Sequence, residues 1–260
     1  MKKIKLGIFG PSGRMGTSII SELKEFKSQL ILTSLCEQKN HPSKGKIINE
    51  IEIVDCLESF VKNCEVIIDF TSPDATLKLM KKLNNNSKVC LITGTTGFSK
   101  DQYKDFKNLA KKLTVLQSFN MSLGVNLLLQ TVQKISEKIS DDVDVEISET
   151  HHKHKKDAPS GTALLIGNAV KKGRKIKSDS YIFRNLNYNE KRKKGGIGFS
   201  SIRGGDVIGE HTTFFFMDGE RIEITHKASD RNIFSKGALH AAVWIKNKDP
   251  GLYSMIDVLE

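Results

Sequence analysis

Residues 4–16 read IKLGIFGPSGRMG, and this stretch decides the fold of the first half of the chain. Residues 4–9, mostly apolar apart from Lys5, are typical of a short buried strand, and the glycines at positions 10, 13 and 16 form a turn. Apolar side chains then recur at helical spacing through Phe26. A strand, a glycine turn and a helix in this order are the context in which a glycine-rich motif indicates dinucleotide binding.

Each glycine of this turn has its own expected role. Gly10 permits the tight turn, Gly13 lets a pyrophosphate approach the backbone, and Gly16 allows close packing of the helix on the strand. The spacing is G-x-x-G-x-x-G rather than G-x-G-x-x-G, so a turn that serves packing alone stays an alternative. Glu37 ends the next predicted strand, about 20 residues past the turn, where an acidic side chain usually bonds the ribose hydroxyls of a dinucleotide.

The same unit recurs along the chain. Continuous apolar runs at 66–70, 89–92 and 114–116 are typical of strands that are covered on both faces. Turn residues follow each run, and helical patterns follow the first two. Alternating strands and helices predict an α/β fold with a doubly wound parallel sheet of Rossmann type. Such sheets bind ligands at the carboxyl ends of their strands, where Gly94-Thr95-Thr96-Gly97 lies.

After Gly124 the pattern changes. A long helical pattern at 125–139 precedes alternating residues at 143–148, which are typical of a half-buried strand. Further strand patterns follow residue 196, and they predict a second, α+β domain with a mixed open sheet and helices on one side. Residues 172–194 are polar and basic and are expected to be rich in loops. His211 is expected to be packed rather than catalytic.

Residues 149–163 read ETHHKHKKDAPSGTA and connect the alternating strand to a predicted helix. Histidines titrate near neutral pH, so His151 and His152 can exchange protons, and Lys155 could serve as a second acid. The backbone amides at Gly161 and Thr162 open the helix, and a helix N-terminus can hold a carboxylate. The segment therefore predicts a site for a small dicarboxylate beside a proton donor. A solvated loop is the alternative, and no metal is expected because cysteine and carboxylate partners at zinc spacing are missing.

Composition narrows the class of protein. The hydrophobic content is 38% and no apolar run reaches the ~20 residues of a membrane span, so no membrane partner and a cytoplasmic location are expected. A net charge of +11 raises the alternative of nucleic-acid binding. The lysines, however, are spread along the chain, aromatic residues make up only 7%, and no nucleic-acid-binding motif is present. We therefore expect no nucleic-acid partner.

The segment at 149–163 resembles the signature of the bacterial 4-hydroxy-tetrahydrodipicolinate (dihydrodipicolinate) reductases of lysine biosynthesis. Their pattern is Glu-x-His-His-x-x-Lys-x-Asp-Ala-Pro-Ser-Gly-Thr-Ala, and every fixed position is met here. The resemblance runs from end to end and includes the glycine spacing of the first turn. It implies NAD(P)H-dependent reduction of a cyclic imine dicarboxylate with loss of water, by a homotetramer. It also implies a dinucleotide-binding domain at 1–122 and 232–260, and a substrate-binding and oligomerisation domain at 123–231.

The resemblance assigns residues to roles. His151 and Lys155 are the expected catalytic residues, and the substrate is expected to contact His152, Ser160, Gly161 and Thr162. The residues expected to bind the cofactor follow the strands of the first domain: Gly10, Pro11, Ser12, Gly13, Arg14, Met15, Glu37, Phe70, Thr71, Gly94, Thr95, Thr96, Ser118, Phe119, Asn120 and Met121. Two positions depart from the family. Met121 replaces a phenylalanine, and Gln38 stands where many relatives have an arginine that accepts a 2′-phosphate.

These departures leave NADH and NADPH both open as cofactors. We favour NADH, although Lys39 could supply charge for a 2′-phosphate. Two further alternatives stay open because a fold does not fix a function. One is another Rossmann oxidoreductase of amino-acid metabolism, and the other is a dinucleotide sensor without catalytic activity.

Overall fold

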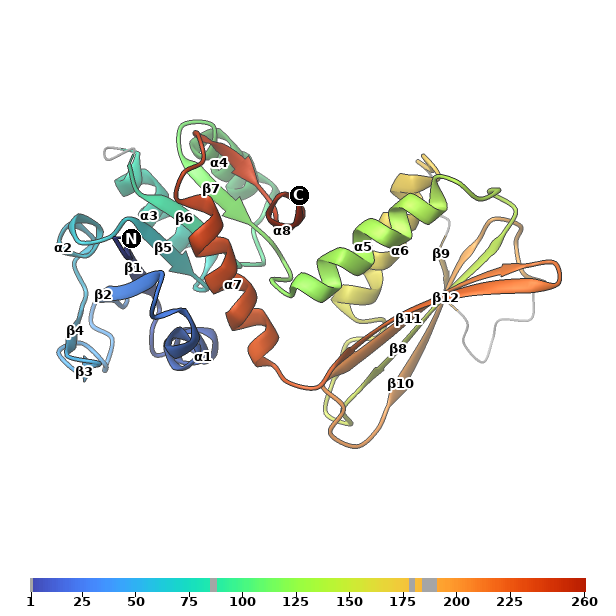
Figure 1. The fold of residues 1–260 in the computed structure, drawn as a ribbon, viewed down its shortest axis with the longest axis horizontal. Coiled ribbons are helices and arrows are strands. Elements are labelled where there is room, and N and C mark those ends of the chain that lie inside the picture. Colours follow the sequence, from blue (N-terminus) through green and yellow to red (C-terminus); the bar gives the residue numbers. More distant parts are fainter. Residues whose placement is uncertain (1, 85–87, 178–180, 184–190) are drawn as a thin grey trace. The chain divides into compact units, whose positions relative to one another are not determined.

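The structure is a computed structural model that describes residues 2–84, 88–177, 181–183 and 191–260. It divides into two compact units, one formed by Met1–Ser122 with Asn232–Glu260 and the other by Leu123–Arg231 (Figure 1). Among the described residues, no helix is long and apolar enough to span a membrane.

The first unit is built on an eight-stranded sheet with the order β13-β7-β6-β5-β1-β2-β4-β3. Every neighbouring pair is parallel except β3 and β4, which are antiparallel. Its strands are β1 (Ile4–Phe9), β2 (Leu30–Cys36), β3 (Ile47–Ile48), β4 (Ile51–Val54), β5 (Val66–Asp69), β6 (Cys90–Thr93), β7 (Thr114–Gln117) and β13 (Gly251–Tyr253). Its helices are α1 (Arg14–Glu22), the 3₁₀ helix η1 (Leu23–Phe26), α2 (Leu57–Lys62), α3 (Pro73–Leu83), α4 (Lys100–Ala110), α7 (Asn232–Ile245) and α8 (Met255–Leu259).

The order in which successive strands are added to this sheet reverses between β1 and β5. The chain runs from β1 outward through β2 and β4, then returns to the other side of β1 and continues through β5, β6 and β7. The loops after β1 and β5 therefore leave the sheet in opposite directions, and open α/β sheets bind ligands at such a switch point. The prediction of a doubly wound parallel sheet is confirmed.

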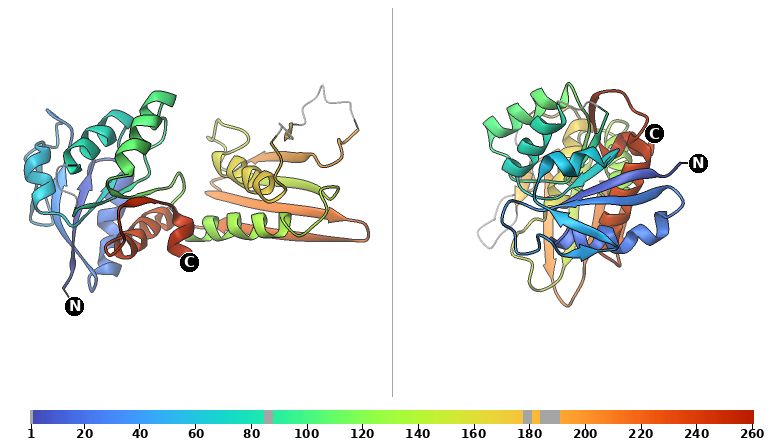
Figure 2. Two further views of the ribbon diagram at one scale, coloured as in Figure 1. Left: turned by 90° about the horizontal axis from the view of Figure 1, so that it is seen from above. Right: turned by 90° about the vertical axis from the view of Figure 1, so that its left-hand side faces the viewer.

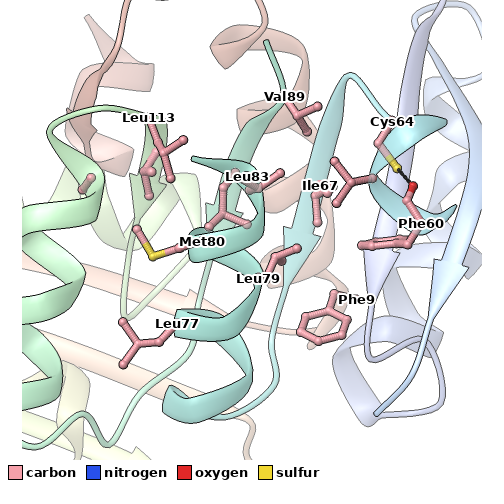
Figure 3. Packing of buried hydrophobic residues seen from close by; sticks show 14 of the residues in the cluster. Phe9, Phe60, Cys64, Ile67, Leu77, Leu79, Met80, Leu83, Val89 and Leu113 are labelled. Atoms are coloured by element: carbon pink, nitrogen blue, oxygen red, sulfur yellow. Dashed lines mark hydrogen bonds between the residues drawn. The ribbon is translucent and has the colours of Figure 1, made fainter. Parts of the chain in front are cut away.

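One face of this sheet carries a core that α2, α3 and α4 cover (Figure 3). Leu77, Leu79, Met80 and Leu83 of α3 pack there with Ile67 of β5. Ile68, the next residue of β5, is equally buried but points to the opposite face, because side chains alternate along a strand. On that face α7 contacts β5, β6 and β7 as well as α1. Helices cover both faces of the sheet at β5, which is why consecutive residues of this strand are apolar.

Gly16 was expected to allow close packing of the helix on the strand. In the structure, the backbone atoms closest to Gly16 belong to the glycine turn, so this residue allows α1 to pack closely against the turn. A Cβ atom on Gly16 would lie 2.3 Å from the Gly10 carbonyl oxygen and 2.7 Å from Pro11 Cα. Both are backbone atoms, which cannot move aside as a flexible side chain can. Gly10 itself adopts a φ of +80°, a conformation that favours glycine.

We expect Gly16→Ala to lower the free energy of unfolding by about 1–3 kcal/mol, the usual cost of overpacking. Gly13→Ala is the matched control, since a Cβ there would meet the Gly10 oxygen at an ordinary 3.4 Å. Urea unfolding of both variants measures the difference. Equal stability of the two variants would contradict the argument.

The second unit is a five-stranded mixed sheet with the order β12-β11-β8-β10-β9. β8 is antiparallel to β11 and parallel to β10. α5 and α6 lie side by side on one face of this sheet (Figures 1 and 2). The elements are α5 (Leu123–Ser136), β8 (Asp144–His151), α6 (Gly161–Gly173), β9 (Tyr181–Phe183), β10 (Ile197–Arg203), β11 (Gly209–Met217) and β12 (Glu220–Ala228). The prediction of a mixed sheet with helices on one side is confirmed.

Two local predictions need correction. The predicted loop at 172–194 contains the end of α6 and the short strand β9, which pairs with β10; residues 178–180 and 184–190 lie outside the described part of the chain. The strand predicted at 143–148 continues to His151, because β10 and β11 pair with it on both sides as far as its last residues. His151 is therefore a strand residue.

Candidate active site

The residues expected to bind the cofactor follow the carboxyl ends of β1, β2, β5, β6 and β7, five strands that are neighbours in the sheet. The turn after β1 is tied to β2, because Gly10 N donates to Cys36 O at 2.9 Å. Ser12 N donates to the Glu37 carboxylate at 2.9 Å. The structure thus brings Glu37 against the glycine turn, although 25 positions separate Glu37 from Ser12.

The turn has the shape that a dinucleotide needs. A Cβ on Gly13 would meet only one atom, at 3.4 Å, so the surface beside this residue is open enough for a pyrophosphate. α1 begins immediately afterwards, and the positive end of a helix favours phosphate. The residues of this turn therefore fit the pyrophosphate of a dinucleotide.

A buried carboxylate organises the next two loops, and sequence reasoning did not find it. Asp69 is fully buried at the end of β5. It accepts hydrogen bonds from the hydroxyls of Thr71 at 2.6 Å, Thr76 at 2.5 Å, Thr93 at 2.9 Å and Thr95 at 3.2 Å. Burial raises the pKa of this carboxyl, and the donated hydrogen bonds oppose that rise. The loops after β5 and β6 are thereby held together.

Other expected cofactor residues lie on these loops. The ring of Phe70 covers Gly94, where a Cβ would come within 2.0 Å of the ring. Thr71 N donates to Thr95 Oγ1 at 3.2 Å. Thr96 is exposed beside them.

In the segment after β7, Phe119 is exposed to solvent and Met121 is buried. Ser118 Oγ donates to Asn120 O at 2.7 Å, which closes a tight turn. Phe119 is 56% exposed, whereas Met121 is 2% exposed. The Met121 carbonyl packs so closely on α7 that a Cβ on Gly237 would lie 1.8 Å from its oxygen.

Lys39 lines a surface pocket that also contains Lys78, Lys81 and Lys82. Asp55 and Glu58 line it too, so the pocket carries both charges. The cluster of lysines was not evident from the sequence around Glu37, because three of its members come from α3.

In the second unit, three polar side chains and one backbone amide meet at the inner face of the sheet. Glu149 Oε2 lies 2.5 Å from His151 Nδ1. Arg203 donates two hydrogen bonds to Glu149, at 2.9 Å to Oε2 and 2.7 Å to Oε1. The Ser160 amide donates to Glu149 Oε1 at 3.2 Å. Sequence reasoning placed Glu149 in the motif but gave it no role, and it placed Arg203 in a tight turn with a structural or intersubunit role.

His211 joins this group from β11. Its Nε2 lies 3.0 Å from Ser160 Oγ, and its ring packs edge-on against His151 with 5.1 Å between centroids. Ser160 also caps α6, accepting from Ala163 N at 3.1 Å. His211 is buried, and it was expected to be packed.

The remaining predicted site residues lie on the connection between β8 and α6. His152 N donates to Val207 O at 2.7 Å, which fixes the start of the connection. Lys155 Nζ lies 2.9 Å from Asp157 Oδ2, and the lysine side chain stays partly exposed. Gly161 and Thr162 are the first residues of α6, and the space beside Gly161 is open. Side chains that could exchange a proton and a helix start that could hold an anion are thus within one short segment.

Charges at this site follow from burial and pairing. Burial would raise the pKa of Glu149, but the hydrogen bonds from Arg203, Ser201 and His151 outweigh it and lower the pKa to about 2. Burial lowers the pKa of His151, although Glu149 opposes that shift. At neutral pH the pair is therefore a carboxylate and a neutral imidazole whose Nδ1–H donates to Glu149.

Burial, with repulsion from His151, lowers the pKa of His211 from 6.5 to about 4. Because the pKa of His211 is lower in the folded state than in the unfolded state, the unfolded state takes up a proton first as the pH falls. Protein stability is therefore highest above pH 6.5 and decreases as the pH falls towards the folded-state pKa. We therefore expect the free energy of unfolding to fall by about 3 kcal/mol between pH 6.5 and 4 on account of His211. His211→Gln should flatten this pH dependence, as measured by urea unfolding at each pH. His154→Gln, which removes an exposed histidine, should leave it unchanged; identical curves for both variants would refute the assignment.

Among the described residues, no group of three or more His, Cys, Asp or Glu side chains is arranged to hold a metal ion.

The first unit has a mostly parallel sheet with a switch point, a glycine turn and an acidic side chain against that turn. These features define the class: a Rossmann-type dinucleotide-binding protein that carries a separate α+β unit. The family model for the N-terminus of dihydrodipicolinate reductase matches residues 4–121, and the model for its C-terminus matches residues 124–259. The chain therefore belongs to the dihydrodipicolinate reductase family. This family is NAD(P)H-dependent, and its N-terminal domain is the dinucleotide-binding domain.

Individual relatives agree with the family models. The chain is 44% identical to a 4-hydroxy-tetrahydrodipicolinate reductase of Bartonella tribocorum, with 98% of both chains covered. It is 41% identical to one of Rhodopseudomonas palustris, with 100% of this chain and 98% of the other covered. A solved structure of a dipicolinate-bound dihydrodipicolinate reductase from Paenisporosarcina sp. TG-14 has the same fold, with a TM-score of 0.79 at 21% identity over 97% of this chain and 98% of that one.

Proposed function

We propose that this chain reduces (2S,4S)-4-hydroxy-2,3,4,5-tetrahydrodipicolinate to (S)-2,3,4,5-tetrahydrodipicolinate in lysine biosynthesis. The substrate, NAD(P)H and one proton give the product, NAD(P)⁺ and one water. The observation that carries the proposal is the arrangement on β8 and α6, where a carboxylate-paired histidine, a lysine and an open helix start follow one another. Membership of the family supports the same reaction.

The site residues have separate tasks in this proposal. When bound, the reduced nicotinamide supplies a hydride to ring carbon 4. His151 exchanges a proton with the substrate, at the ring carbon next to the one that receives the hydride. Lys155 is a second proton donor, and its positive charge offsets the charge of a dicarboxylate. His152, Ser160 and the amides of Gly161 and Thr162 hold the carboxylates and so orient the ring.

The cofactor is proposed to contact the residues that follow the five neighbouring strands, from the glycine turn through Met121. Arg14 and Met15 begin α1 beside the pyrophosphate position, with Pro11 and Ser12 before them. We favour NADH because Glu37 points into the glycine turn, where a carboxylate suits ribose hydroxyls better than a phosphate. The lysines beside Lys39 are the feature that favours NADPH.

We also propose a cytoplasmic homotetramer that assembles through the sheet of the second unit. Ile202 and Phe216 are exposed there, and both alternate with residues of the inner face, so they point away from α5 and α6. Light scattering of the purified chain measures the assembly.

The test of function is the initial rate of NADH and NADPH oxidation, followed by absorbance, with enzymatically generated substrate. Oxidation that depends on this substrate supports the reductase. Cofactor binding without any oxidation would identify a dinucleotide sensor, and oxidation with a different amino-acid intermediate would identify another oxidoreductase. Rates with the two cofactors decide the preference.

A further inference from the structure

We propose that Glu149 and Arg203 are positioning residues for the imidazole of His151. Glu149 fixes the proton of the resting imidazole on Nδ1, so that Nε2 is the nitrogen that exchanges a proton with the substrate. Arg203 holds the Glu149 carboxylate in place and connects it to the segment that carries Lys155. This inference rests on the proposed function for its catalytic consequence, but its structural part can be tested without any substrate.

The sheet register places these side chains together. Along β8 the residues Val145, Ile147, Glu149 and His151 are buried in alternation, so the apolar inner face continues directly into the Glu–His pair. Arg203 of β10 is the register partner of His151. Glu149, His151 and Arg203 therefore lie on one face of the sheet because of strand pairing, and no loop has to fold to bring them together.

The Glu149 carboxylate is fully satisfied although its side chain is completely buried. Arg203 approaches both oxygens, the Ser160 amide donates to one, and His151 Nδ1 lies against the other. An isolated buried carboxylate would take up a proton, whereas an arginine partner keeps it ionised. An ionised carboxylate only accepts hydrogen bonds, so the ring nitrogen that faces it must carry the hydrogen.

The other ring nitrogen is left beside a glycine. A Cβ on Gly209 would lie 3.0 Å from His151 Nε2, which is tighter than an ordinary contact. The absence of a side chain at this position therefore leaves room next to the nitrogen that the proposal makes reactive. The tautomer and the open space beside Gly209 thus both favour Nε2 of His151 as the atom that exchanges a proton.

Arg203 extends the arrangement to the connection between β8 and α6. In addition to Glu149, it donates to the Asp157 carbonyl oxygen at 2.6 Å. Asp157 in turn pairs with Lys155. One guanidinium thus fixes the backbone near the second proposed proton donor while it holds the carboxylate that orients the first.

The kinetic test compares Glu149→Gln with Glu146→Gln. Glu146 is a matched control because it lies on the same strand and also pairs with an arginine, Arg192, at 2.6 Å, but on the opposite face and without a histidine. We expect Glu149→Gln to lower kcat about 10–100-fold, the effect typical of removing a partner that orients a metal-bound imidazole. KM for the substrate and the affinity for NADH should stay close to those of the parent chain. Glu146→Gln should keep the parent kcat, and equal losses in the two variants would overturn the proposal.

The tautomer test uses ¹⁵N NMR of histidine-labelled protein, with His151 assigned by its loss in His151→Gln. In the parent chain we expect the proton on Nδ1 alone. In Glu149→Gln an NH2 group replaces one carboxylate oxygen. At the Oε1 position it would face two donors, Arg203 and the Ser160 amide, whereas at the Oε2 position it would face Arg203 and could donate to His151 Nδ1. We therefore expect the proton to be shared between the two ring nitrogens. An unchanged Nδ1 tautomer in this variant would overturn the proposal even if kcat falls.

Two further variants separate positioning from folding. Glu149→Asp keeps the charge but has a shorter side chain, and we expect its kcat to lie between those of the parent and Glu149→Gln. If Glu149→Gln does not fold, Glu149→Asp replaces it in the kinetic and NMR measurements. Parent values in both measurements would then overturn the proposal. Arg203→Lys keeps one charge but cannot make the paired hydrogen bonds, and we expect a lower kcat there too. A parent chain that does not oxidise NADH with the substrate would refute the proposed function, while the NMR result would still decide the role of Glu149.

Discussion

A His151→Gln variant is expected to reduce the cyclic imine about 10²–10⁴-fold more slowly than the parent chain, the usual contribution of a positioned acid–base group. Glutamine keeps a polar side chain of similar size but cannot exchange a proton near neutral pH. The loss should fall on kcat, because the residue acts on the reacting ring and not on the cofactor. Steady-state rates with saturating NADH, together with NADH affinity by fluorescence, measure both quantities.

His154→Gln is the control for His151, since it removes an exposed histidine from the same basic segment. Turnover in this variant should match that of the parent. Thermal unfolding of His151→Gln checks that the partners Glu149 and Arg203 still hold the sheet together. A folded His151→Gln protein with parental turnover would exclude His151 as the proton-exchanging residue.

Substitution of Lys155 should have an effect of the same size, and two variants can separate its two roles. Lys155→Ala removes both the proton donor and the positive charge, so we expect kcat to fall about 10²–10⁴-fold and KM for the dicarboxylate to rise. Lys155→Arg keeps the charge, but a guanidinium does not release its proton in proteins. It should therefore restore KM while kcat stays low.

Lys156→Ala is the matched control, because this neighbouring lysine is exposed. If Lys155→Arg recovers both KM and kcat, charge alone explains the residue and the proton-donor role is wrong. Parental kinetics in Lys155→Ala would remove the residue from the site altogether.

Much of the fold could be predicted because its signals are local. Periodicity located most of the parallel strands and most helices, and the glycine spacing located the turn after β1. The short strands β3, β9 and β13 were missed because two or three residues carry no periodicity. β8 was predicted too short since the polar residues Glu149 and His151 interrupt the apolar alternation, although they keep its period of two.

The candidate site was less accessible to sequence reasoning because its supporting contacts are distant along the chain. Arg203 meets Glu149 across 54 positions, through the pairing of β8 with β10. Asp69 gathers threonines from the loop and helix that follow β5 and from the end of β6 and the loop after it, and no spacing rule describes such a cluster. Residues of the β8–α6 segment were found because they are contiguous; the residues that hold them in place were not.

The origin of α7 and β13 at the end of the chain has a consequence for synthesis on the ribosome. The region Leu123–Arg231 emerges complete and can fold while translation continues. The first unit cannot fold completely so early. The face of its sheet that carries Ile68 is not covered by α7 until Asn232–Ile245 leaves the exit tunnel. In addition, β7 lacks its outer partner β13 until Gly251–Tyr253 follows. The last cover of this sheet is therefore added only after nearly the whole chain has been synthesised.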